Sequence, residues 1–253
     1  MTAATANVPD GPEQLPVGLE PLRAGTAGPE PVLVGTGLCK SFGSTSALSR
    51  ARLSVRPREV VAVMGPSGSG KSTLLHCLAS ILQPNAGTVT YRGAELTVLS
   101  DRARSELRRR EFGFVFQFGQ LVPELTCLQN VALPLRLARI SRREAERAAR
   151  DWLRRLEVDD VADKRPGETS GGQGQRVAVA RALVASPSVV FADEPTGSLD
   201  SLNGDRVMRL LLDAVRESGA AVVLVTHEPR VAAYADREVI VRDGRTRDLE
   251  PAL

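Results

Sequence analysis

GPSGSGKST occupies residues 65 to 73 and matches the spacing Gly-x-x-x-x-Gly-Lys-Ser, which is typical of phosphate-binding loops. The apolar run from Val60 to Met64 precedes this segment and predicts a buried strand. Apolar residues follow it at helical spacing, at Leu74, Leu75, Leu78, Ile81 and Leu82. A strand, a glycine-rich loop and a helix in this order predict an α/β fold that binds a nucleotide at the loop.

The loop consists of Gly65, Pro66, Ser67, Gly68, Ser69, Gly70, Lys71, Ser72 and Thr73. Its glycines allow successive backbone N–H groups to converge on phosphate oxygens, and the start of the next helix adds its positive dipole end. We expect Lys71 to reach the terminal phosphates and Ser72 to hold magnesium. A flexible Gly/Ser turn is the alternative, but the lysine and the hydroxyl at these positions favour nucleotide binding.

The composition sets limits on the partners of this chain. Its 253 residues include 33 basic and 30 acidic ones, and the formal charge of +3 gives no indication of nucleic-acid binding. Arginines are frequent at 102–110 and 136–155, but acidic residues are interspersed among them. This pattern predicts solvated helix faces with local ion pairs.

Neither a membrane span nor a disulfide framework is predicted. No stretch reaches the 18 or more apolar residues of a spanning helix, and the amino terminus lacks the pattern of a signal peptide. Cys39, Cys77 and Cys127 are odd in number and widely spaced, which predicts a reduced, cytosolic setting. We therefore expect any membrane role to depend on a partner.

Strands and helices are predicted to alternate along most of the chain. Residues 1 to 30 are rich in Pro, Gly, Ala and Thr, and we expect a disordered tail there. Strands are predicted at Val32–Leu38, Ala51–Val55, Val60–Met64, Thr88–Tyr91, Val189–Ala192, Ala221–Val225 and Glu238–Val241. Helices are predicted at Arg142–Leu156, Val177–Val184 and Val207–Val215, with a largely helical region from about 124 to 165. This order predicts a mainly parallel sheet with helices on both faces.

Four phenylalanines alternate with other residues at Phe112, Phe114, Phe116 and Phe118. Strict alternation places them on one face of an extended segment. We expect that face to belong to the core rather than to a cofactor site.

Two adjacent carboxylates, Asp193 and Glu194, follow the apolar strand 189–192. The carboxyl edge of an open α/β sheet is where ligands bind, and adjacent strand residues point in opposite directions. Asp193 is therefore expected on the magnesium side and Glu194 as the general base for the attacking water. Such a pair taken alone is more often an ordinary turn, and the upstream phosphate loop favours the catalytic interpretation.

A second helix start with bare backbone N–H groups is predicted at Ser170, Gly171, Gly172 and Gln173. The alternative is a glycine turn with Ser170 as the helix cap. Two separate phosphate-type loops in one protein are unusual unless the second serves the nucleotide of another subunit.

Taken together, these motifs resemble those of the ATP-binding cassette (ABC) ATPases, from roughly Val32 to Gly244. The resemblance implies that Phe42 stacks on adenine and that Gln117 contacts magnesium and water. It also implies that His227 contacts the terminal phosphate.

The resemblance also assigns roles to residues at a subunit interface. It implies that Ser170 to Gln173 form the signature that completes the site of the opposite subunit. The loop Ser198-Leu199-Asp200 is implied to communicate across the dimer. Two positions depart from the usual signature, because Thr169 replaces a leucine and Gly174 replaces a helix former. Gly174 is expected to cost about 1 kcal/mol of helix propensity relative to alanine.

Finer similarity points to one branch of this family. Residues 112–117, 121–126, 130–135 and 192–199 are similar to the lipoprotein-release, macrolide-export and cell-division ATPases. The implied fold is a P-loop NTPase cassette over residues 31–253, with a mainly parallel sheet core, a small antiparallel β subdomain and an α-helical subdomain at about 95–165.

The implied function is hydrolysis of ATP with Mg²⁺ by two copies that enclose the nucleotide and drive a separate membrane permease. The implied permease has few spans and a large external domain, and the ATPase would lie on the inner face of the cell membrane. One alternative is a soluble cassette ATPase, but the stretch between Thr73 and Ser170 is too short for a long coiled coil. The other alternative, an ATP-binding module without turnover, is disfavoured by Glu194 and His227.

An apolar stretch after Gln117 predicts the surface that contacts the permease. It contains Phe118, Leu121, Val122, Leu125 and Leu128, more apolar residues than a loop beside a polar site needs. The alternative is that these residues fill the junction between the sheet core and the helical region.

Overall fold

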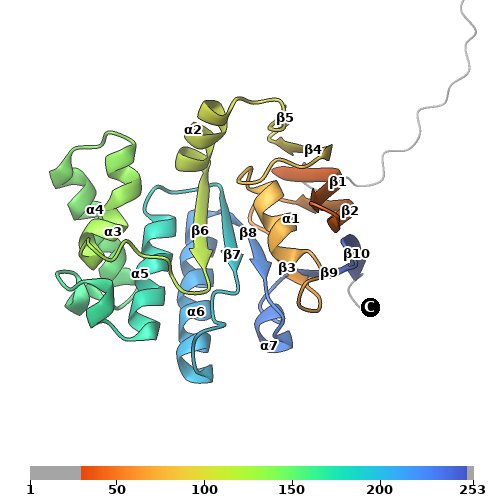
Figure 1. The fold of residues 1–253 in the computed structure, drawn as a ribbon. Helices are drawn as coiled ribbons and strands as arrows, with labels where there is room; N and C mark the ends of the chain where they lie inside the picture. Colours follow the sequence, from red (N-terminus) through yellow and green to blue (C-terminus); the bar gives the residue numbers. More distant parts are fainter. Residues whose placement is uncertain (1–29, 250–253) are drawn as a thin grey trace, which may run out of the picture.

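The computed structural model describes residues 30–249 (Figure 1). The predicted tail spans residues 1–30, and its residues 1–29 lie outside the described residues, as do the last four residues, 250–253. No helix within the described part of the chain is both long and apolar enough to cross a bilayer.

A six-stranded sheet forms the centre of the molecule, with the strand order β10-β9-β3-β8-β7-β6. Its strands are β3 (Val60–Met64), β6 (Phe112–Phe116), β7 (Val189–Asp193), β8 (Ala221–Val225), β9 (Arg237–Arg242) and β10 (Arg245–Leu249). All neighbouring strands are parallel except β10, which pairs antiparallel with β9. The carboxyl ends of β3, β6, β7 and β8 therefore meet at one edge of the sheet, at the bottom of Figure 1.

A four-stranded antiparallel sheet lies beside it, with the order β2-β1-β4-β5. The strands are β1 (Leu33–Phe42), β2 (Thr45–Val55), β4 (Ala86–Tyr91) and β5 (Ala94–Glu95). Tyr91 connects this sheet to the central one, because its ring packs edge-on against Phe112 of β6 with the ring centroids 5.3 Å apart.

Seven α-helices and two short 3₁₀ helices complete the described structure. The α-helices are α1 (Lys71–Leu78), α2 (Asp101–Glu111), α3 (Cys127–Leu137), α4 (Arg142–Arg155), α5 (Gly171–Leu183), α6 (Ser201–Ser218) and α7 (Pro229–Ala232). The 3₁₀ helices are η1 (Asp159–Val161) and η2 (Pro166–Glu168). Helices α3 and α4 stand together at the left of Figure 1, on the far side of α5 from the sheet.

An apolar core lies on each face of the central sheet, because its strands carry apolar side chains on both faces. Val190 and Ala192 of β7 pack in a core with residues of α3 to α6, whereas Val189 and Phe191 pack in a second core with α1, β1 and β2. The alternation follows from the two-residue period of a strand. These cores confirm the predicted parallel sheet with helices on both faces.

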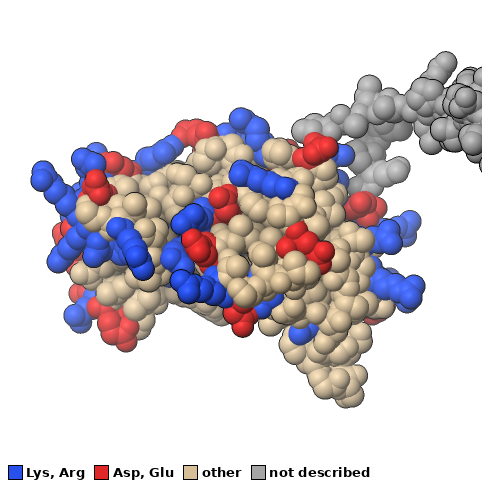
Figure 2. Space-filling view, turned by 90° about the horizontal axis from the view of Figure 1, so that it is seen from above, with Lys and Arg blue, Asp and Glu red and all other residues tan. Residues whose placement is uncertain are grey.

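The basic stretches carry the ion pairs that their sequence predicts. Glu106 pairs with Arg110 at 2.8 Å in α2, and Arg142 pairs with Glu146 at 2.7 Å in α4. Figure 2 looks down on α2 from above and shows Lys and Arg side chains interspersed with Asp and Glu.

One expectation about the core is wrong. Strand β6 ends at Phe116, and Phe118 is 75% exposed, so only part of the alternating set lies in the core. The chain leaves the extended conformation at Gly119 and Gln120, whose φ angles are +66° and +47°. Alternation in the sequence continues past the point where the strand stops pairing.

Candidate functional site

The phosphate loop is curled tightly between β3 and α1. Gly65 and Gly70 have φ angles of +147° and +107°, which other residues rarely adopt. A Cβ atom at Gly65 would lie 2.1 Å from the carbonyl oxygen of Val241, and one at Gly70 would lie 2.3 Å from that of Ala47. Glycine is therefore required at both positions, by backbone conformation and by the close approach of neighbouring strands.

Lys71 lies inside the curl of this loop. Its side chain is buried, and its Nζ donates to the carbonyl oxygens of Gly65 and Pro66, each at 2.9 Å. The Ser69 hydroxyl is buried nearby without a hydrogen-bond partner among the described residues. A buried ammonium held only by carbonyls and an unpaired hydroxyl form a suitable environment for an anion such as a phosphate group.

Ser72 and Asp193 meet at the carboxyl edge of the sheet. The Ser72 hydroxyl donates to Oδ1 of Asp193 at 3.2 Å. Burial raises the pKa of Asp193, and the hydrogen bond from Ser72 opposes that rise. A hydroxyl and a carboxylate at this place are the oxygen ligands that Mg²⁺ takes beside phosphates.

Glu194 follows in a strained conformation with a φ of +47°. Its backbone N–H donates to the carbonyl of Val225 at 2.9 Å, and its Oε1 lies 3.0 Å from Nδ1 of His227. Positive φ at a residue other than glycine is found frequently at active sites. Here it turns the carboxylate away from the sheet core and toward the end of β8.

A hollow of about 670 Å³ lies between these groups. Its lining residues are Met64, Gly65, Pro66, Ser67, Lys71, Glu194, His227 and Ile240. The structure thus brings the phosphate loop, the expected base and the expected histidine to one cavity.

Gln117 reaches the same edge from the end of β6. A Cβ atom at Gly197 would lie 2.8 Å from Nε2 of Gln117 and 3.2 Å from Oε2 of Glu194, so both side chains approach Gly197. The Ser198 hydroxyl also donates to the carbonyl of Gln117 at 2.9 Å.

Phe42 is placed differently from the other expected site residues. It ends β1 at a hairpin tip, is 51% exposed and does not line the hollow. The ammonium of Lys40 lies 5.6 Å from the centroid of its ring. An exposed ring of this kind is available for stacking on a planar ligand.

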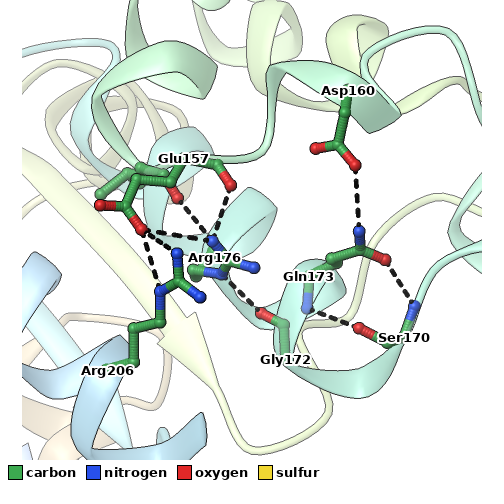
Figure 3. A network of polar contacts seen from close by, with 8 residues as sticks. Glu157, Asp160, Ser170, Gly172, Gln173, Arg176 and Arg206 are labelled. Atoms are coloured by element: carbon green, nitrogen blue, oxygen red, sulfur yellow. Dashed lines mark hydrogen bonds and ion pairs between the residues drawn. The ribbon is translucent and has the colours of Figure 1, made fainter.

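The Ser170–Gln173 segment forms the start of α5, as Figure 3 shows. The Ser170 hydroxyl accepts from the N–H of Gln173, and the Gln173 side chain accepts from the N–H of Ser170. Gln173 Nε2 also donates to Asp160 at 3.3 Å. Among the described contacts, none joins this segment to the phosphate loop, so Ser170 is not part of the hollow.

The signature instead packs against the start of α6. A Cβ atom at Gly172 would lie 3.1 Å from the Asn203 side chain, and one at Gly171 would lie 3.4 Å from Leu199. Asp200 caps α6 by accepting from the N–H groups of Leu202 and Asn203, and these hydrogen bonds lower the pKa of its carboxyl group.

Arg176, which the sequence did not single out, fixes the signature helix to its surroundings (Figure 3). It is buried and donates to the carbonyls of Leu156 and Glu157, at 3.2 and 2.7 Å. The Glu157 carboxylate in turn accepts from Arg206 of α6. The only sequence signal for this network is a charged residue at a buried helix position.

The two unusual signature positions are accommodated locally. Thr169 donates its hydroxyl to the carbonyl of Pro166 at 2.8 Å. A Cβ atom at Gly174 would lie 3.4 Å from that hydroxyl oxygen. Thr169 thus replaces an apolar anchor with a hydrogen bond.

Comparison with known proteins agrees with this geometry. The family described as ABC transporter matches residues 48–197. The lipoprotein-releasing system ATP-binding protein LolD 2 of Caulobacter vibrioides is 44% identical over 219 residues, which cover 85% of this chain and 96% of that protein. LolD of Cereibacter sphaeroides is 46% identical over 219 residues, covering 85% of this chain and 98% of its own length.

A solved structure of an ATP-binding cassette is also similar to this chain over most of its length. The ATP-binding cassette MJ0796, a dimer in a post-hydrolysis state bound to ADP and Pi, is 36% identical with a TM-score of 0.81. The match covers 87% of this chain and 99% of that chain. Family match, sequence identity and fold therefore agree with the site, and the chain belongs to the ABC transporter family as one of its ATP-binding ATPases.

Proposed function

We propose that this ATPase works as a nucleotide-sandwiched dimer that drives a separate membrane permease in the release of lipoproteins. The main support for a dimer is that the two helix starts suited to anions, those of α1 and α5, lie apart within one subunit. Ser170 and Gly171 are exposed at the start of α5, outside the hollow that contains Lys71. A second copy facing head to tail would place each signature over the phosphate loop of the other.

Such a dimer explains how nucleotide drives a conformational change. ATP would contact both subunits only in the closed arrangement, and a ligand shifts an equilibrium by its differential affinity for the two states. The dimeric state of MJ0796 with ADP and Pi supports this proposal.

Within each site, the residues divide the work of hydrolysis. Lys71 and the loop N–H groups hold the phosphates, and Glu194 accepts the proton of the attacking water. His227, at 3.0 Å from Glu194, orients this carboxylate toward the hollow. Asp200, at the start of α6, connects the signature region to the dimer interface.

Mg²⁺ fits the oxygen donors at this edge of the sheet, where Ser72 contacts Asp193. Ser72, Asp193 and Gln117 would hold it, and the described residues contain no cluster of three or more His, Cys, Asp or Glu that would bind a metal by itself. A site with few protein ligands suits Mg²⁺, because this ion keeps water and phosphate oxygens in its shell. When bound, it neutralises charge on the phosphates.

An apolar groove provides a docking surface for the permease. It has a volume of about 450 Å³ and is formed by residues of α2, β6, α3 and α5. Its apolar lining includes Ile81, Phe114, Phe116, Leu133, Pro134 and Leu137. Leu137 is 58% exposed, and Phe118, two residues after Phe116 of the groove lining, is 75% exposed. Apolar exposure of this kind is typical of surfaces that bind a partner.

The five predicted docking residues differ in exposure, and Val122 and Leu125 are half-buried. Leu128 is buried and Leu121 packs against the core, so these two fill the junction between the sheet and the helices. Phe118 remains available. Docking would hold the chain at the inner face of the membrane.

Lipoprotein release is the function named in the relatives from Caulobacter vibrioides and Cereibacter sphaeroides. A test is to reconstitute the chain with its permease in vesicles that carry a lipid-anchored protein. ATP should release the anchored protein with the wild-type chain and not with Glu194→Gln. ATP hydrolysis stimulated by the permease without any release would show that the cargo is of another kind.

A further inference from the structure

Arg181 of α5 makes an unusual contact with the turn that follows Gln117. Its Nη1 donates to the carbonyl of Gln120 at 2.8 Å, and its Nη2 donates to the carbonyl of Gly119 at 2.7 Å. Among the described residues, no carboxylate lies within ion-pair distance of this guanidinium. Burial removes the charge of Arg181 partly from water and thereby lowers its pKa. The two carbonyls are the groups that compensate it.

The turn itself depends on such external support. Gly119 and Gln120 both have positive φ, and the N–H of Gln120 donates to the carbonyl of Phe118 only two residues earlier. For Gln120 this conformation is unfavourable and persists only where the surroundings impose it.

A second residue of α5 holds the other end of the turn. Gln175 is buried, and its Nε2 donates to the carbonyl of Phe116 at 2.9 Å. Gln117 thus lies between the Phe116 carbonyl, which accepts from Gln175, and the carbonyls of Gly119 and Gln120, which accept from Arg181. Three hydrogen bonds therefore attach the Gln117 segment to α5, the helix that begins with the signature.

We propose that Arg181 is a positioning residue that fixes Gln117 to α5. Gln117 serves the metal side of one nucleotide site, and the signature at the start of α5 serves the opposite site, so the two move as one unit. The inference rests on the proposed role of Gln117 in hydrolysis. When the dimer closes on Ser170, the resulting movement of α5 therefore changes the position of Gln117 in the same subunit. No long chain of contacts is needed between the two.

The test compares Arg181→Met with Arg181→Lys and Arg136→Met in the full chain. Arg136 is a control, since it also donates to a backbone carbonyl, that of Ile140, but lies in α3 away from the hollow. In the metal-free protein, amide hydrogen exchange in residues 117–120 should rise for Arg181→Met, be intermediate for Arg181→Lys and stay unchanged for Arg136→Met. Exchange in β3 and α1 should not change in any of them.

A double-mutant cycle separates positioning from a general loss of structure. In hydrolysis assays, Arg181→Met should raise the Mg²⁺ concentration for half-maximal rate by about 10-fold, the lower end for residues that support a metal ligand. In a Gln117→Ala background the same change should have no further effect. Equal effects in both backgrounds, or unchanged exchange at 117–120, would overturn the inference. If Gln117→Ala alone leaves hydrolysis and metal dependence unchanged, the proposed role of Gln117 fails instead.

Discussion

Nδ1 of His227 and Oε1 of Glu194 lie 3.0 Å apart, at the ends of the neighbouring strands β8 and β7. Parallel pairing sets this distance, because Asp193 is in register with Val225 and the two strands end together. Two residues separated by more than thirty positions are thus brought to one hollow by strand register.

Glu194→Gln should abolish hydrolysis while leaving ATP binding intact. The amide keeps the shape of the side chain but cannot accept the proton of the attacking water, and loss of a general base costs about 10²- to 10⁴-fold in rate. Phosphate release and equilibrium nucleotide binding measure the two properties separately. Glu95→Gln, at an exposed site in β5, serves as the control. Hydrolysis at the wild-type rate by Glu194→Gln would remove it from the role of base.

Mixed dimers test the composite site. Lys71→Ala and Ser170→Arg should each be inactive alone, because each places a lesion in both sites of a symmetric dimer. In a heterodimer of the two variants, head-to-tail geometry gathers both lesions in one site and leaves the other intact. Mixing equal amounts should restore about a quarter of wild-type activity if subunits exchange freely and the two sites act independently. Wild-type activity of Ser170→Arg alone would exclude a role for this segment in the partner's site.

Sequence periodicity predicted the central strands well because their residues are apolar on both faces. Strands β3 and β8 have the predicted bounds, and β7 is longer by Asp193 alone. Strands β5 and β10 were missed, since short or charged edge strands such as Arg245–Leu249 carry no apolar pattern. Apolar periodicity places this helix at Val177–Val184, whereas α5 begins at Gly171, at the helix start predicted from Ser170–Gln173, because Ser170 caps the glycine-rich first turn.

The site was predictable where chemistry is concentrated in a short motif, and less so where it depends on side-chain packing. Asp193, Glu194 and the phosphate loop could be found from spacing. The contacts of Arg181 and Arg176 could not, because both side chains donate to backbone carbonyls of distant segments that no residue pattern identifies. Leu121 and Phe118 look alike in sequence and differ only in what packs over them.

Tyr91→Phe should destabilise the junction between the two sheets in a pH-dependent way. The Tyr91 hydroxyl donates to Glu111 at 2.5 Å, and this hydrogen bond lowers the pKa of Glu111, while burial raises the pKa of Tyr91 to about 12. At neutral pH the variant should lose about 1.5 kcal/mol, typical of a hydrogen bond to a charged group. That corresponds to a melting temperature lower by about 3 to 6 °C.

The difference should shrink at both extremes of pH. A lowered carboxyl pKa contributes stability that is lost as the pH falls below 4.5, the ordinary value for glutamate. A raised phenol pKa contributes stability that is lost as the pH rises from 10 toward 12. Thermal melts between pH 3.5 and 11 measure this, and a difference independent of pH would contradict the assigned hydrogen bond.

Phe118→Asp and Leu137→Asp should separate docking from folding. Both side chains are more than half exposed, so a carboxylate at either position costs little in the isolated chain, whereas it would be buried without a partner beneath a docked permease. Both variants should hydrolyse ATP and melt like the wild type but fail to co-purify with the permease. Leu128→Asp is the contrasting variant, because Leu128 is only 7% exposed and the new charge should lower the melting temperature itself. Unchanged co-purification of both exposed variants would place the docking surface outside this groove, and loss of folding in both would mean that these residues serve packing instead.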